Sequence, residues 1–221
     1  MADEVKTRRR RSYNSPLRAD QAQQTRRRIL ESARELFVEK GYAATTVAAV
    51  ADHAGVSADT IYLSLGGKRG LLEGVMDITG PHSSTTQDDE WWQTVSQLPD
   101  PAQRLDKMVE YSCRILARTR PIHAIVRGAA DKEAFAAELG QRLLEERLAN
   151  QTARIRRFLG GELAPGVSIT EAGQRYCALA SPDLYYVLTV ELGWTPAQHR
   201  KWLTALIRRD LLRQCPAAPR S

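Results

Sequence analysis

The sequence predicts an all-α protein in which a small N-terminal helical domain precedes a larger helical domain. Apolar residues recur every three or four positions along most of its 221 residues, which is the period of an α-helix. Capping sequences begin at Asp100, Ser168 and Thr195, because each of these side chains stands three residues before a Glu or Gln. No hairpin turn of the Asn-Gly kind separates alternating apolar segments. The sequence therefore favours helices throughout.

The chain begins with a basic segment, residues 1–22, which we expect to be a flexible arm. Residues 1–28 contain nine basic and three acidic side chains, an excess as large as the net charge of +6 of the whole chain. The remaining acidic and basic residues balance. The excess positive charge suits a polyanionic partner.

Residues 23–78 have the pattern of a helix-turn-helix with a supporting helix on each side. The first supporting helix carries an apolar stripe and stops at Gly41. Thr45 or Thr46 then caps a short helix, because a threonine oxygen accepts from the free N–H groups of a first turn. The apolar stripe of that helix consists of Val47, Val50, Ala51 and Ala54.

A glycine turn joins this helix to a second short helix. Gly55 accepts the positive φ that a sharp turn requires, and Ser57 is expected to cap the helix that follows. Ile61 and Leu65 are predicted to face the core, which leaves Ala58, Asp59, Thr60 and Tyr62 on the outer side. A further apolar-patterned helix opens at Lys68.

These signals together resemble the N-terminal DNA-binding domain of the tetracycline-repressor (TetR) family. The resemblance covers about residues 25–75. It implies that the second short helix enters the major groove of DNA. The matching residues are Ile29, Leu30, Ala33, Leu36, Phe37, Gly41, Tyr42, Thr45, Thr46, Val50, Ala51, Ala54, Gly55, Val56, Ser57, Thr60, Ile61, Tyr62, Lys68, Leu71 and Leu72.

We expect the residues that contact DNA to lie in and beside this second helix. Tyr62 and Lys68 are predicted to bind phosphates. Further contacts to the DNA backbone are expected from Thr45, Thr46 and Ser57, and the positions nearest the bases are Ala58, Asp59 and Thr60. Arg8, Arg9, Arg10 and Arg11 either follow the minor groove or the phosphates beside a half-site, or form a solvated tail with sequence-independent attraction.

Three positions depart from the family pattern. Ser64 replaces the usual His, which weakens or replaces one phosphate contact, and Leu65 replaces the usual Phe with a smaller core residue. Asp59 stands where glycine is common. Its carboxylate can favour the helix N-terminus through the macrodipole or accept from a cytosine amino group.

A polar loop over residues 79–90 is expected to lead into an all-α second domain, residues 90–213, followed by a disordered tail over residues 214–221. Pro121 and Pro182 are predicted to mark helix starts or kinks. In the family this chain resembles, the last two helices form a four-helix dimer interface. The candidate surfaces here are Leu184, Tyr185, Val187, Leu188 and Leu192, and Trp202, Leu203, Leu206, Ile207 and Leu211. The alternative is that these residues form the core of one subunit.

The resemblance also implies a small-molecule pocket among the middle helices. Pockets combine aromatic walls with a few polar anchors, and the candidates by type and position are Trp91, Trp92, Tyr111, His123, Arg127, Phe135 and Tyr176. Each has a structural alternative: Trp91 and Trp92 can cover the domain junction, His123 can lie on the surface after Pro121, and Asp131 can neutralise Arg127.

Composition excludes several other classes. The three cysteines are widely spaced and odd in number, so neither a disulfide framework nor a metal site is predicted, and a reducing cytoplasm is expected. No stretch approaches the length of an apolar membrane span, and no signal sequence is evident. We find no glycine-rich phosphate loop, nucleophile elbow or histidine beside a nucleophile, so neither an enzyme nor a cofactor is predicted.

The predicted function is therefore a sequence-specific, homodimeric transcriptional repressor that binds an inverted repeat in double-stranded DNA. A small-molecule effector would release it by changing the separation of its two reading helices. The alternative is a DNA-binding scaffold whose helical domain binds a protein partner.

Overall fold

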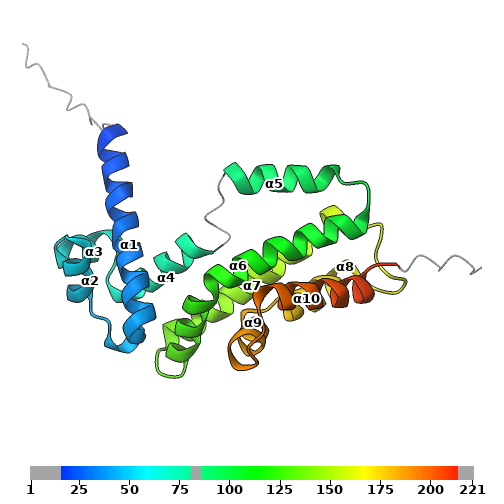
Figure 1. Ribbon diagram of the computed structural model, residues 1–221. Helices are drawn as coiled ribbons and strands as arrows, with labels where there is room; N and C mark the ends of the chain where they lie inside the picture. The colour runs from blue at the N-terminus through cyan, green and yellow to red at the C-terminus, as the bar shows by residue number, and fades with distance from the viewer. Residues whose placement is uncertain (1–15, 81–85, 214–221) are drawn as a thin grey trace, which may run out of the picture.

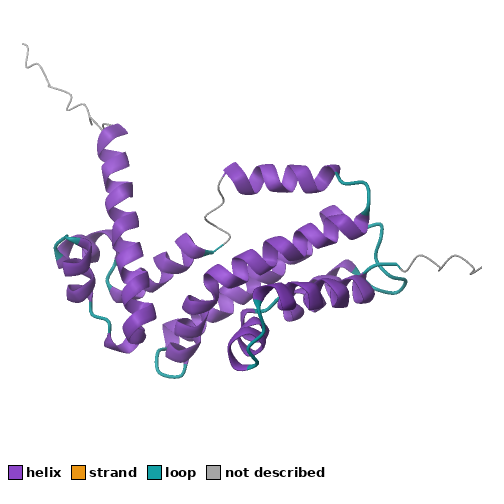
Figure 2. Ribbon diagram, viewed as in Figure 1, coloured by secondary structure: helices purple, strands orange, loops and turns teal. Residues whose placement is uncertain are grey.

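A computed structural model describes residues 16–80 and 86–213 of the chain. Those residues form α-helices, one π-turn and loops, with no strand longer than the single bridge between Leu163 and Leu212 (Figure 2). A small N-terminal group of helices lies at one end of a larger helical domain (Figure 1). The predicted fold class is confirmed.

The N-terminal group contains α1 (Pro16–Ala44), α2 (Val47–Ala54), α3 (Ala58–Leu65) and α4 (Lys68–Thr79). The φ of 79° at Gly41 interrupts the regular part of α1, as the glycine signal predicts. Thr46 caps α2 and Ser57 caps α3, each accepting from a backbone N–H three residues on. Gly55 ends α2 in the left-handed conformation.

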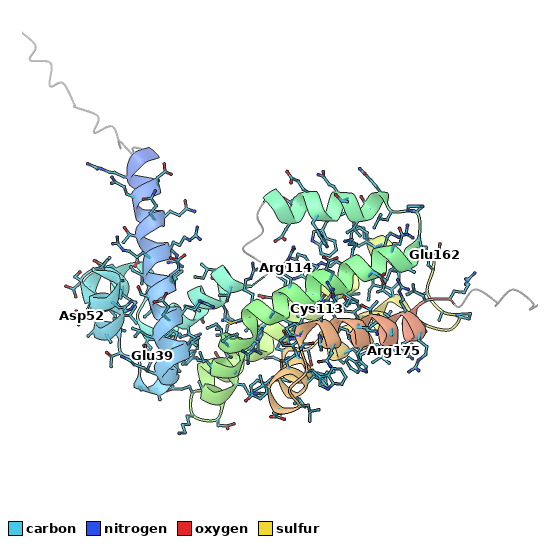
Figure 3. The ribbon with its side chains drawn as sticks, viewed as in Figure 1. Glu39, Asp52, Cys113, Arg114, Glu162 and Arg175 are labelled. Carbon is cyan, nitrogen blue, oxygen red and sulfur yellow. The ribbon has the colours of Figure 1, made fainter. Side chains whose placement is uncertain are left out.

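The larger domain is built on two long helices, α6 (Pro101–Ala130) and α7 (Ala134–Leu159), which lie side by side. Around them lie α5 (Thr86–Gln97), α8 (Ile169–Leu179), α9 (Pro182–Tyr186), the π-turn Val187–Glu191 and α10 (Pro196–Leu211). Arg114 (labelled in Figure 3) joins α6 to α5 by an ion pair of 3.2 Å with Asp88. The predicted caps at Asp100, Ser168 and Thr195 all form.

Several sequence predictions about element boundaries were wrong. Residues 16–22 belong to α1, so the proposed arm is helical over that part, while Arg8, Arg9, Arg10 and Arg11 lie outside the described residues. The predicted loop 79–90 already contains the start of α5. Pro121 lies inside α6, so it does not mark a helix start.

The surfaces predicted for dimerisation are in large part the core of the subunit itself. Five of the ten candidate residues are less than a tenth exposed: Tyr185, Leu188, Leu203, Ile207 and Leu211. Leu192, in contrast, is 62% exposed. Local sequence pattern cannot separate these two uses of an apolar face, because both place apolar residues at the same helical spacing.

The two domains share part of their cores. Ile122, Val126 and Leu139 of α6 and α7 are packed in one cluster with the apolar residues of α1 to α4. Within the N-terminal domain, α1 and α4 approach closely at Gly74, where an added Cβ would lie 2.6 Å from a methyl carbon of Leu30. The DNA-binding candidates and the larger domain are therefore joined by packed side chains rather than by a loose linker.

Candidate DNA-binding surface and ligand cavity

The second helix of the helix-turn-helix, α3, presents a polar and partly apolar outer face. Ser57 accepts from the backbone N–H of Thr60, and the two hydroxyls lie 2.8 Å apart, so both are held at the helix N-terminus. Asp59 is exposed in the first turn, where a carboxylate is favoured by the helix dipole. Tyr62 is 57% exposed. The outer face predicted from sequence is thus available to a partner, with Ala58 and Thr60 half-buried beside it.

Thr45 does not face outward, contrary to its predicted contact. Its side chain is buried, and its hydroxyl lies 2.8 Å from the carbonyl oxygen of Gly41 and 3.1 Å from that of Leu36. The hydroxyl thus closes the end of α1 onto the start of α2. Thr46 is the exposed member of the pair, and its oxygen accepts from Ala49 N–H.

Lys68 is held in place by the last turn of α1. Its Nζ donates to the carbonyl oxygen of Ala43 at 3.1 Å and lies 4.3 Å from the centre of the Tyr42 ring. Partial burial lowers the pKa of this ammonium. The position of a cation at the start of α4 and beside the end of α1 suits a phosphate contact.

Sequence reasoning missed two features of this surface. Leu63 is 89% exposed on α3, although the apolar pattern gave it no outward role. Arg26 of α1 donates to the carbonyl oxygen of Ser64 at 2.8 Å, which ties α1 to the end of α3. A separation of 38 residues hides such a contact from any local pattern.

A cavity of about 70 Å³ lies between α4, α6, α7 and the start of α9. Because a water needs roughly 10–15 Å³ of such space, this cavity has room for about five water molecules. Its apolar lining consists of Met76, Ile115, Leu116, Leu143, Ala180 and Pro182.

Polar side chains form the inner wall of this cavity. Ser112 lies 3.1 Å from the hydroxyl of Tyr176 and accepts from Nε2 of Gln151 at 3.4 Å. All three residues are almost completely buried, and burial raises the pKa of Tyr176. The Oε1 atom of Gln151 is buried without a hydrogen-bond partner. This is a costly arrangement, because a buried acceptor without a donor loses its hydration.

Charged and titratable side chains complete the lining. The guanidinium of Arg154 lies 4.6 Å from the centre of one Trp92 ring and 4.8 Å from that of Tyr111, and burial lowers its pKa. Arg147 donates to the sulfur of Cys177 at 3.3 Å. Burial also lowers the pKa of His123 to about 4, so its imidazole is uncharged at neutral pH.

Only part of the predicted pocket set lines this cavity. Tyr111 and His123 do so, and Tyr176 stands directly behind Ser112. The other four do not line it. Trp92 packs against Tyr111 with ring centres 4.7 Å apart, and Trp91 lies beneath Lys107 and Arg114. Arg127 pairs with Asp183 rather than Asp131. Phe135 packs against Tyr42.

The main omission of the sequence prediction is the wall that α7 contributes. Arg147, Asn150, Gln151 and Arg154 all line the cavity, and they recur at i, i+3, i+4 and i+7. That spacing places four polar residues on one helical face. The recurrence of these four residues on one face of α7 was the available signal.

The end of α4 connects the cavity to the helix-turn-helix. Met76, Asp77 and Gly80 belong to the cavity lining. Arg118 of α6 donates to the carbonyl oxygens of Thr79 at 2.7 Å and Gly80 at 3.0 Å, which stabilises the C-terminal end of α4. A molecule in the cavity would therefore touch the last helix of the N-terminal domain.

Neither a metal site nor a membrane span is found within residues 16–80 and 86–213. No group of three or more His, Cys, Asp or Glu side chains there is placed to hold a metal ion. Among the helices of that part of the chain, none has the length and apolar character needed to cross a membrane.

Part of the N-terminal domain is similar to a known family. Residues 29–75 match the family described as bacterial regulatory proteins, tetR family. The uncharacterized HTH-type transcriptional regulator YvkB of Bacillus subtilis (strain 168) is 43% identical over 60 residues, which cover 27% of this chain and 30% of that protein. The alignment thus spans less than a third of this curated relative.

Solved structures extend the similarity to the whole fold. NalD of Pseudomonas aeruginosa, the secondary repressor of the MexAB-OprM multidrug efflux pump, has a TM-score of 0.65 at 21% identity, covering 88% of this chain and all of that chain. A complex of SmeT with triclosan has a TM-score of 0.66 at 17% identity, covering 90% of this chain and 98% of that one. At these identities the likeness shows the fold.

Proposed function

We propose that this chain is a dimeric transcriptional repressor that a small molecule releases from DNA. The premise is that residues 29–75 match the tetR family of bacterial regulatory proteins. The observation that carries the proposal is the shared position of α4. This helix closes the DNA-binding domain and also lines the cavity with Met76, Asp77 and Gly80.

In this proposal α3 enters the major groove and reads base edges. Asp59 and Thr60 stand nearest the bases, and the exposed Leu63 is suited to a thymine methyl group. Tyr62 and Lys68 bind phosphates, and Thr46 and Ser57 add contacts to the DNA backbone at the helix N-termini. The arginines of residues 8–11 supply further attraction to phosphates.

Dimerisation supplies the second reading helix. A two-fold dimer on an inverted repeat places its recognition helices one or more helical turns apart, roughly 34–36 Å for one turn. The exposed Leu192 and Val190 near the C-terminal helices are suited to a contact between subunits.

Release follows from the geometry of the cavity. A ligand that fills it presses on the end of α4, which Arg118 holds against α6. A shift of α4 changes the spacing of the two recognition helices, and both half-sites then lose affinity together. A cavity whose accessible lining is largely apolar supports this function over a scaffold for a protein partner.

Selection of bound duplexes from a random DNA pool tests the proposal. The purified protein is incubated with the pool at one near-physiological salt concentration, because affinities vary steeply with salt. Enrichment of an inverted repeat is expected. Recovery of unenriched DNA would contradict a sequence-specific dimer, and a variant with Tyr62 and Lys68 both changed to Ala serves as the binding-deficient control.

A further inference from the structure

The amide of Gln151 is the most unusual group in the cavity. The residue is 5% exposed and lines the cavity, and its Nε2 atom donates a hydrogen bond to Oγ of Ser112. Its Oε1 atom is buried without a donor. Buried polar atoms in folded proteins are nearly always hydrogen-bonded, so this oxygen points to a ligand that brings a donor.

Equal numbers of acidic and basic side chains line the cavity. Arg147 and Arg154 are matched in number by Asp77 and Glu146. The guanidinium of Arg154 is also engaged with the hydroxyl of Tyr111 and with the ring of Trp92. His123 is uncharged at neutral pH because burial lowers its pKa. A ligand with a full charge would therefore lose hydration without meeting an excess of the opposite charge.

The remaining surface of the cavity is apolar. Ile115, Leu116 and Leu143 offer methyl groups to the body of a ligand, and the volume of about 70 Å³ limits that body to about one ring. An apolar ring with one hydrogen-bonding group matches both parts of the lining.

We propose that the effector of this cavity is an uncharged single-ring hydroxyl compound of the phenol class, whose hydroxyl donates to Oε1 of Gln151. This inference rests on the proposed function, since it names the ligand of the same regulatory site. It requires no covalent step, because the phenol is bound and released unchanged.

Calorimetric titration of the full-length protein at pH 7 tests the chemistry of the ligand directly. The four probes are p-cresol, its hydroxyl-free analogue p-xylene, the anion p-toluate and the cation 4-methylbenzylammonium. A phenol has a pKa near 10 and stays uncharged at this pH. We expect p-cresol to bind about tenfold more tightly than each of the others, since only p-cresol satisfies the buried oxygen without a charge.

Gln151→Met isolates the role of the amide, because methionine keeps the length of the side chain and removes the acceptor. In this variant the ratio of p-cresol to p-xylene affinity should fall to about one. The matched control is Gln141→Met on the same helix, where an exposed amide donates to Glu145. That variant should keep the tenfold ratio.

Equal affinities of p-cresol and p-xylene for the unmodified protein would overturn the inference. So would tighter binding of either charged probe, an unchanged ratio in Gln151→Met, or no binding of any probe. Failure of the proposed function is a separate result. It would be seen if the protein enriched no DNA sequence, or if p-cresol did not release the protein from the enriched DNA. Binding of p-cresol with the expected selectivity would uphold the ligand chemistry in that case too.

Discussion

Acid should destabilise the folded protein through His123. The pKa of this imidazole is lowered from 6.5 to about 4, chiefly by burial and secondly by the nearby Arg147, while Asp183 opposes the shift. The unfolded chain therefore takes up the proton first as the pH falls. Stability is fully present above about pH 6.5, and it is lost progressively between that value and pH 4.

The magnitude follows from the two pKa values. A full difference of roughly 2.5 pKa units corresponds to about 3.5 kcal/mol at about 1.4 kcal/mol per unit. At pH 5.0 the unfolded state is almost fully protonated at this site and the folded state is mostly not. The loss between pH 7.5 and pH 5.0 should therefore be about 2 kcal/mol from His123 alone.

Urea unfolding at pH 7.5 and pH 5.0 measures this loss in the unmodified protein and in His123→Gln. Other groups, including the buried His199, titrate in both proteins, so the difference between the two pH-dependent losses isolates His123. We expect the unmodified protein to lose about 2 kcal/mol more than the variant. Equal losses would refute the conclusion that this histidine is buried in its neutral form.

Three further predictions concern the DNA surface, the packing of the larger domain and the domain junction. Lys68→Ala should weaken binding to all duplexes and lower the slope of log K against log salt by about one; an altered base preference at one position would contradict a phosphate contact. Gly173→Ala should lower the free energy of unfolding by about 1–3 kcal/mol, because its Cβ would lie 2.1 Å from Oγ1 of Thr152. Adding Thr152→Ala should recover part of the lost stability in urea unfolding, and no recovery would argue against this clash. Arg118→Gln should speed hydrogen exchange of the last amides of α4, since two guanidinium bonds to its carbonyl oxygens are lost; unchanged exchange there would show that other contacts hold the helix end.

The helix-turn-helix could be predicted from sequence because its determinants are local. Thr46 and Ser57 each bond within three residues, and Gly55 needs only its own φ of 64°. Such signals need no knowledge of which helices meet. The same reasoning failed for Thr45, because its hydroxyl bonds back to Leu36, nine residues away.

The cavity could be predicted only in outline, because it depends on which helices face one another. Aromatic type and position selected Tyr111 correctly, but the same criteria selected Phe135, which packs against Tyr42 instead. Gln151 has no local signal of its buried, unpartnered oxygen. That state exists only once α6 and α7 are packed together.

The close approach of α1 and α4 at Gly74 has a mechanical consequence. With Leu30 filling the space beside Gly74, neither helix can slide past the other without a clash. Under the proposed release mechanism the N-terminal helices would therefore rotate together, with the cavity at the end of α4 and α3 on the far side of α1 from α6 (Figure 1). A small displacement at Gly80 would then move α3 farther, since rotation moves the more distant end farther.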